Sequence, residues 1–178
     1  MYYKKILAAA LTVSCIGGIV PANSVQAASL KIRYSGKTRY YKGKQLHVSY
    51  ANKNLSSKYV GIQINKVNMI PYYDYLVKQG PKVKRTYSKS SGKLILKNGD
   101  DTLTAYVGKR TYYLNGVKKT FSVAPTKVKY YKTKKTIILI PANAIVKGLG
   151  LNYKYSSSSK RIYITQPIIP SDSTTQVQ

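Results

Sequence analysis

The sequence predicts an α+β fold: two repeated units of short antiparallel strands, each with one short helix packed on the twisted sheet. Three observations support this prediction. Short β-like runs are separated by turn residues, two Ile-Pro steps are each followed by a helix-like apolar stripe, and both features recur at a nearly constant offset. An apolar stripe on a short helix has to be buried against another element, and one face of a sheet provides that surface.

Residues 1–27 have the form of a secretory signal peptide. Lys4 and Lys5 precede an apolar stretch from Ile6 to Val20, and Val25-Gln26-Ala27 has the small-x-small pattern of a cleavage site. The apolar stretch is short for a membrane span. We therefore expect a mature chain that begins near Ala28, contains no cysteine and has no transmembrane segment.

The region from residue 28 to residue 166 reads mainly as strands. Runs rich in tyrosine, valine and isoleucine alternate with glycine, serine or asparagine, which is typical of strands and turns. The expected strands are Lys31–Tyr34, Thr38–Lys42, Gln45–Tyr50, Tyr59–Asn65, Lys82–Tyr87, Lys93–Lys97, Thr102–Val107, Thr111–Leu114, Lys118–Val123, Thr136–Ile140, Asn152–Tyr155 and Arg161–Thr165. Because the connections are short, we expect antiparallel hairpins and meanders.

Two short helices are expected, from about Pro71 to Gln79 and from about Pro141 to Leu149. The prolines suit the first helical position, and Gly80 and Gly150 suit the residue just past the end. Apolar side chains follow at i, i+3, i+4 spacing in both segments: Tyr72, Tyr75 and Leu76 in the first, Ala142, Ile145 and Val146 in the second. Helices of about nine residues are unstable alone in water, so these stripes must pack on the strands.

The landmarks occur twice in the same order. Tyr34-x-Gly36-Lys37 is matched by Tyr106-x-Gly108-Lys109 at an offset of 72 residues, and Ile70-Pro71 is matched by Ile140-Pro141 at an offset of 70. A repeat of this length predicts a duplicated module, with units at 28–100 and 101–166. The tail at 167–178 is rich in proline, serine and threonine, which predicts disorder.

The residues of the repeat resemble the N-terminal stalk domain of copper amine oxidases, a module also found without the oxidase in exported proteins of Gram-positive bacteria. The second unit is the closer match, through Tyr112–Val117, Ala124-Pro125, Ile138–Pro141, Gly148–Gly150 and Ile162–Ile164. The family commonly has an arginine two residues after the proline, where this chain has Tyr73 and Asn143. The resemblance implies a helix packed on an antiparallel sheet and a non-catalytic spacer or cell-surface role. It does not imply copper.

The charge is the main indication of function. The net charge is +27, there is no glutamate, and the only acids are Asp74, Asp100, Asp101 and Asp172. Self-repulsion of this size destabilises a compact state and favours a polyanionic partner. A surface charged only for solubility is the alternative. Lysine outnumbers arginine 26 to 5, and lysine acts as a point charge with little geometric demand, so we expect the partner to be recognised as a line of negative charge.

The strongest local candidate for polyanion binding is the segment 127–135. It contains Lys127, Lys129, Lys132, Lys134 and Lys135. Val128 and Tyr130 alternate with the first two lysines, which places Lys127 and Lys129 on the solvent face of a strand. Lys118 and Lys119 extend the candidate set, as do Lys82 and Lys84 if they lie on the same face. For each run the alternative is a strand edge that lysine protects from aggregation.

Metal binding and catalysis are not expected, and neither is a cofactor. Outside residues 1–27 the chain has one histidine, His47, one methionine, Met69, and four aspartates. These residues do not form a cluster with metal-ligand spacing. General acid–base chemistry usually needs a histidine or a pair of carboxyl groups, and no phosphate loop or nucleophile motif is present.

We therefore expect an exported, non-enzymatic module, secreted or held at a Gram-positive cell wall, that binds an anionic wall polymer such as teichoic acid. The main alternative is an extracellular protein that binds nucleic acid or an anionic glycan, because tyrosines interleaved with lysines also suit base stacking along a phosphate backbone. A cationic membrane-active or partner-binding protein is the third class. It is disfavoured because the sequence has no long amphipathic basic helix.

Overall fold

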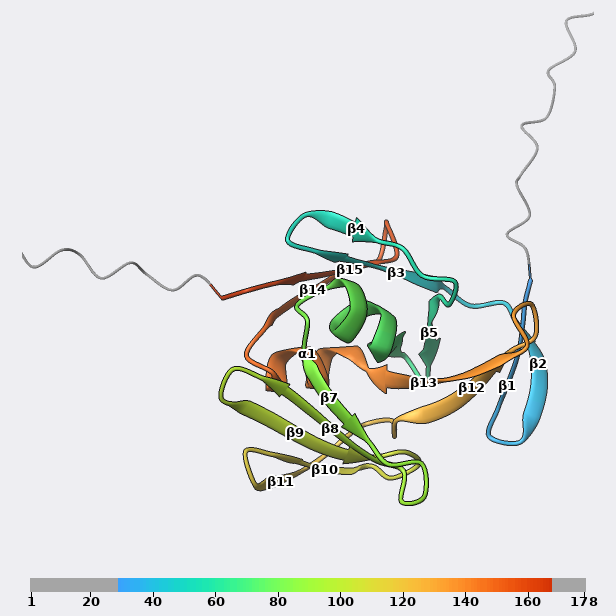
Figure 1. Ribbon diagram of the computed structural model, residues 1–178. Helices are drawn as coiled ribbons and strands as arrows, with labels where there is room; N and C mark the ends of the chain where they lie inside the picture. The colour runs from blue at the N-terminus through green and yellow to red at the C-terminus, as the bar shows by residue number, and fades with distance from the viewer. Residues whose placement is uncertain (1–28, 168–178) are drawn as a thin grey trace, which may run out of the picture.

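The computed structural model describes residues 29–167, and it shows a mostly β fold with two sheets (Figure 1). Within this range 53% of the residues lie in strands and 11% in two short helices. The α+β prediction is therefore wrong. The predicted signal peptide and all but the first residue of the predicted tail lie outside the described residues.

The larger sheet has ten strands. Its order is β14 (Asn152–Ser156), β15 (Arg161–Thr165), β3 (Gln45–Tyr50), β5 (Gly61–Ile64), β6 (Val67–Pro71), β13 (Lys135–Pro141), β12 (Thr126–Tyr130), β1 (Leu30–Tyr34) and β2 (Lys37–Tyr41), with β4 (Lys53–Leu55) paired to β3 outside this order. The smaller sheet has the order β11 (Val117–Thr120), β10 (Thr111–Leu114), β9 (Asp101–Tyr106), β8 (Lys93–Asn98) and β7 (Lys84–Tyr87). Residues 28–100 and 101–166 both contribute strands to both sheets.

The two strands that end in Ile-Pro lie side by side in the middle of the larger sheet. β6 and β13 are antiparallel, with Ile70 opposite Ile140. On their other sides, β6 forms a hairpin with β5 and β13 forms a hairpin with β12. The helices that follow β6 and β13 therefore begin at opposite ends of this central pair.

Both helices lie where the sequence predicts them, to within two residues at each end. The π-helix η1 spans Tyr73–Gln79, and the α-helix α1 spans Ala142–Gly148. The prolines, however, do not begin the helices. Pro71 and Pro141 are the last residues of β6 and β13, because each belongs to the register of the β6–β13 pair.

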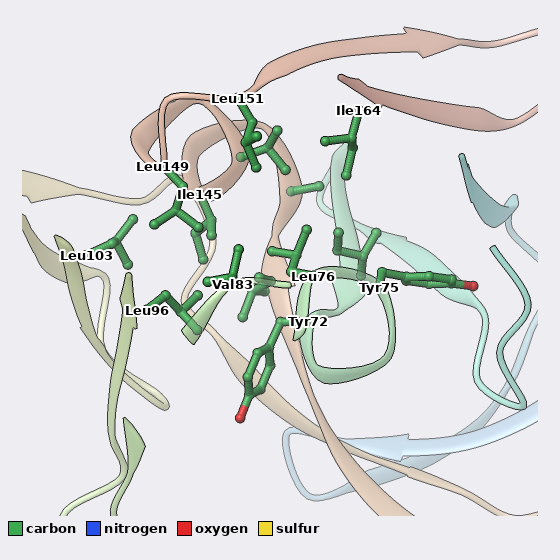
Figure 2. Close-up of a cluster of buried hydrophobic side chains, with 14 of the residues drawn as sticks. Tyr72, Tyr75, Leu76, Val83, Leu96, Leu103, Ile145, Leu149, Leu151 and Ile164 are labelled. Carbon is green, nitrogen blue, oxygen red and sulfur yellow. The ribbon is translucent and has the colours of Figure 1, made fainter. Parts of the chain in front are cut away.

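The main hydrophobic core surrounds the two helices (Figure 2). Leu76 of η1, Ile145 of α1 and Leu96 of β8 are fully buried in this one cluster, together with Ile162 of β15. Figure 1 shows both helices between the smaller sheet and the β3, β14 and β15 strands. This packing explains the failed fold-class prediction: seven-residue helices are too small to cover a sheet, so they fill the space between two sheets.

A second core lies within the curl of the larger sheet. It contains Ile32, Ile62, Ile64, Met69, Val128, Tyr130 and Leu139. Tyr41 on the edge strand β2 reaches β5, where its hydroxyl accepts the Gln63 backbone N–H at 2.7 Å. Four strands separate β2 from β5 in the sheet order, so this bond requires the sheet to curl around the core.

One strand pair departs from the antiparallel prediction. β15 runs parallel to β3, with Ile162 opposite Val48. The two strands are distant in sequence, so no short hairpin fixes their relative direction. Among the helices of residues 29–167, none is long and apolar enough to cross a membrane.

Candidate anion-binding face

The lysines of β12 have the predicted placement. Lys127 and Lys129 are exposed, whereas Val128 and Tyr130 between and beside them are buried. Alternate residues of a strand point to opposite sides of the sheet, so the two lysines share the side that faces the smaller sheet.

Strand β1 adds two cations to this side. Arg33 is the register partner of Lys129, and residues directly opposite each other on neighbouring strands share a face. Lys31 lies opposite Tyr131, whose backbone N–H donates to the Lys31 carbonyl at 3.1 Å. We call Lys31, Arg33, Lys127 and Lys129, with Tyr131, the basic face.

Tyr131 is at the centre of these charges. The Lys31 and Lys129 ammonium nitrogens lie 5.0 and 5.5 Å from the centroid of its ring. Its hydroxyl is 2.9 Å from the Thr38 hydroxyl on β2. The hydrogen bond to Thr38 is the main cause that lowers the pKa of Tyr131, and the neighbouring charges of Lys129, Arg33 and Lys31 act in the same direction. The arrangement stabilises negative charge at this point of the surface.

An open groove of about 680 Å³ adjoins the basic face. Its walls come from β1, the β1–β2 turn, β12 and Thr136 of β13 on one side, and from the β7–β8 and β9–β10 turns of the smaller sheet on the other. Four cations line it: Arg33, Lys89, Lys127 and Lys129. No carboxylate is among its lining residues, so the groove can attract an anion without an internal competitor.

The described acids lie elsewhere. Asp74 accepts a hydrogen bond of 2.5 Å from the Ser57 hydroxyl, and Asp101 accepts one of 2.9 Å from the Asn115 amide. Asp100 lies in the β8–β9 turn, and Asp101 is the first residue of β9. That turn is at the other end of β8 from Lys89, which is roughly 17 Å along a six-residue strand. The charge is therefore distributed unevenly over the molecule.

The other predicted lysines are not gathered on the basic face. Lys132 and Lys134 lie in the β12–β13 turn, and Lys135 begins β13. Lys118 and Lys119 are exposed on β11, at one edge of the smaller sheet. Lys84 is the first residue of β7 and Lys82 precedes that strand, which forms the opposite edge of the sheet. These last two pairs therefore do not extend one continuous face.

Sequence reasoning missed Lys31, Arg33 and Lys89. The alternation Lys31-Ile32-Arg33 was a usable signal, because Ile32 is fully buried and the flanking cations are exposed. This local pattern does not indicate that β1 pairs with β12, because the two strands are about a hundred residues apart in sequence.

The described residues do not fit a copper site. No group of three or more histidine, cysteine, aspartate or glutamate side chains occurs within residues 29–167. His47 is exposed on β3, and Met69 is fully buried in the second core. Copper requires several nitrogen, sulfur or oxygen ligands at one place, and this donor set does not supply them.

Comparison with protein families identifies the class of protein. The family model of the copper amine oxidase N-terminal domain matches residues 50–164, from the end of β3 to β15. The chain therefore belongs to this family, as the resemblance predicted. The match is to the N-terminal domain of the oxidase rather than to its catalytic part. No curated protein and no solved structure matched the chain.

Proposed function

We propose that this protein is an exported, non-enzymatic module of the Gram-positive cell envelope that binds an anionic polymer such as teichoic acid. The proposal rests on a net charge of +27, which becomes about +25 when the predicted signal peptide with Lys4 and Lys5 is removed. The wall polymer is the nearest dense polyanion for a protein that leaves such a cell. Lysine suits it because a flexible polymer offers charge without fixed geometry.

One observation carries the proposal: Arg33, Lys127 and Lys129 line one groove together with Lys89, and no carboxylate shares the lining. Like charges on neighbouring strands repel one another, which costs folding stability. A bound polyanion removes that repulsion, so folding and binding favour each other at this face.

We also propose that the chain is a duplication, with a Pro71 unit at 28–100 and a Pro141 unit at 101–166. Two arrangements support it. The Ile-Pro strands are each other's neighbours, and the two Tyr-x-Gly-Lys turns meet at the groove, where Gly36 and Gly108 are both lining residues. In this view the groove lies between corresponding parts of the two units.

Binding of the mature protein to purified cell walls, with and without teichoic acid and across a salt series, tests the function. The Lys127→Gln/Lys129→Gln variant should bind more weakly, with a flatter plot of log affinity against log salt. For duplex DNA the slope changes by about 0.9 for each lost phosphate contact, and a wall polymer of lower charge density should change less. Lys118→Gln/Lys119→Gln is the matched control, because it removes two charges from one edge strand of the smaller sheet, and neither residue lines the groove.

Two results would contradict the proposal. One is binding that persists at about 1 M salt, where the Debye length is about 3 Å. The other is an equal loss of affinity in both double variants, which would mean that only net charge matters.

Nucleic-acid binding is the second candidate, and the position of Tyr131 among cations favours it. A base stacked on this ring would lose about 1–3 kcal/mol of binding free energy in Tyr131→Leu, whereas wall-polymer binding should barely change. Tyr130, its neighbour in sequence, does not test stacking. It is buried, and its hydroxyl donates to the Val60 carbonyl at 2.6 Å, so replacing it would disturb the core.

A further inference from the structure

Two pockets of nearly equal size lie beside the two Ile-Pro steps. The pocket beside Pro71 has a volume of about 360 Å³, and the pocket beside Pro141 about 350 Å³. Both are built from corresponding parts: the proline, the residues that begin the helix, alternate residues of the next strand and three residues of the other unit's Ile-Pro hairpin. The hairpin residues are Thr136, Ile137 and Ile138 in the Pro71 pocket and Lys66, Val67 and Asn68 in the Pro141 pocket. Each residue of one triplet is 70 positions from its counterpart in the other.

The Pro71 pocket is aromatic. Tyr59, Tyr72, Tyr73 and Tyr87 contribute to its walls. The rings of Tyr72 and Tyr73 meet edge to face, 6.5 Å apart and at 76°. Two walls at nearly a right angle form a corner, not a parallel slot that would hold a flat base between them.

Two charged side chains give the Pro71 pocket polar contacts. The Arg85 guanidinium lies 4.6 Å from the centre of the Tyr73 ring, and it donates to the Tyr72 hydroxyl at 3.3 Å. Asp74 is also a lining residue. Its carboxylate offsets the charge of Arg85, so the two side chains give the pocket no net charge. Because the carboxylate also accepts hydrogen bonds from hydroxyl groups, the pocket favours an uncharged, hydroxyl-bearing group.

The Pro71 pocket borders the cationic groove. Thr136 lines both, and Tyr87 of the pocket is followed after one residue by Lys89 of the groove. A ligand that carries a neutral group close to a phosphate could therefore occupy both at once. A sugar ring has apolar C–H faces that pack on tyrosine rings, and hydroxyl groups that bond to polar side chains, which suits a pocket of this composition.

We propose that the Pro71 pocket binds a neutral sugar unit of the anionic polymer whose phosphates lie in the groove. This proposal rests on the proposed function and names its ligand class, a sugar-bearing polyol phosphate. The Pro141 pocket is not expected to share this role, because Asn143 and Ala144 stand where Tyr73 and Asp74 line the first pocket, and no residue of its lining belongs to the groove.

Two probes test the proposal: a glycerol phosphate oligomer, and the same oligomer carrying glucosyl groups, at equal length and charge. We expect the glucosylated probe to bind about tenfold more tightly, the gain for burying roughly 50 Å² of apolar ring surface. Both probes should show the same salt slope, because the sugar carries no charge.

Variants locate the effect. Tyr73→Ala should abolish the tenfold difference, and Tyr73→Phe should keep most of it. Tyr73 is 46% exposed, so neither change removes a buried core residue. Tyr163→Ala is the matched control, since Tyr163 is also exposed, at 37%, and lies on β15. It should leave the difference intact.

The possible failures are distinct. If neither probe binds with a salt-dependent affinity, the proposed function is wrong. If both bind equally and with the same salt slope, the function stands and the sugar pocket is wrong. If a single-stranded DNA oligomer binds more tightly than both probes and loses that advantage in Tyr73→Ala, the pocket stacks a base, which overturns the sugar assignment.

Discussion

The segments that follow Pro71 and Pro141 have the same length but wind differently. Eight residues separate each proline from a glycine, yet η1 is a π-helix and α1 is an α-helix. At the first end the Gly80 N–H donates to the Tyr75 carbonyl, with φ at −81°. At the second, Gly150 has φ of +69° and its N–H donates to the Lys147 carbonyl. Only Gly150 ends its helix in the left-handed conformation that the sequence signal implies.

The difference coincides with side-chain bulk. Pro71 is followed by Tyr72, Tyr73 and Asp74, whereas Pro141 is followed by Ala142, Asn143 and Ala144. Figure 2 shows Tyr72 and Tyr75 extending from the first helix in different directions, with their hydroxyls at the rim of the cluster. The same pattern of proline, stripe and glycine therefore predicts where a helix lies but not how it winds. It also leaves open which of the two helices has tyrosine side chains from its first turn in an adjoining pocket.

The largest expected effects test whether the two helices are equivalent in the core. Leu76 and Ile145 are both fully buried in the cluster between the sheets. Leu76→Ala and Ile145→Ala should each lower the free energy of unfolding by about 2–5 kcal/mol, because each leaves a cavity in packed surroundings. Urea denaturation measures both. If one variant lost less than about 1 kcal/mol, the helices would not be equivalent parts of one core.

The two glycines should respond unequally to alanine. A Cβ at Gly80 would lie 2.1 Å from the Tyr75 carbonyl oxygen, which is backbone and cannot move away. A Cβ at Gly150 would lie 2.6 Å from a carboxylate oxygen of Asp101, a side chain that can rotate. We expect Gly80→Ala to cost about 3 kcal/mol and Gly150→Ala about 1–2 kcal/mol, the strain of a left-handed residue. Thermal unfolding of the two variants gives the order, and the reverse order would contradict the π-helical ending of η1.

The local features of the fold could be predicted from the sequence. Lys127 and Lys129 alternate with Val128 and Tyr130, and that alternation was enough to place them on an exposed side of a strand. The Ile-Pro steps and the glycines located both helices. Signals of this kind involve residues within a few positions of each other, where side-chain period and turn chemistry act directly.

Long-range pairing could not be predicted in the same way. The basic face needs β1 beside β12, and the parallel β15–β3 pair joins strands from opposite ends of the described chain. Neither pair is linked by a short turn, so no local residue pattern specifies it. The fold-class error has the same origin: helices between two sheets and helices on one sheet have the same apolar stripes.

The smallest expected effect concerns alkaline pH, where the two helices differ by a titratable side chain. Tyr75 of η1 is 2% exposed, and the equivalent position of α1 is Ile145. Burial raises the pKa of Tyr75 to about 12, and the nearby charge of Asp74 adds to the effect. The folded state thus holds this proton more tightly than the unfolded chain, where a tyrosine titrates near pH 10. The associated stability is fully present below about pH 10 and is lost as the pH rises toward about 12.

A Tyr75→Phe variant isolates this contribution from the titration of the other tyrosines and the lysines. Its free energy of unfolding should fall less steeply between about pH 10 and about pH 12, with a gap to the parent chain of at most about 2–3 kcal/mol. Below that range the two proteins should differ by about 1 kcal/mol or less, because the variant loses a long hydrogen bond, 3.4 Å, to the Tyr59 carbonyl and an interaction with Ser57. Ile145→Val, a matched control in α1, should give a pH profile parallel to that of the parent. If the pH profile of Tyr75→Phe were also parallel to that of the parent, Tyr75 would have to titrate in the folded protein as it does in the unfolded chain. The first helix would then not be buried as the second is.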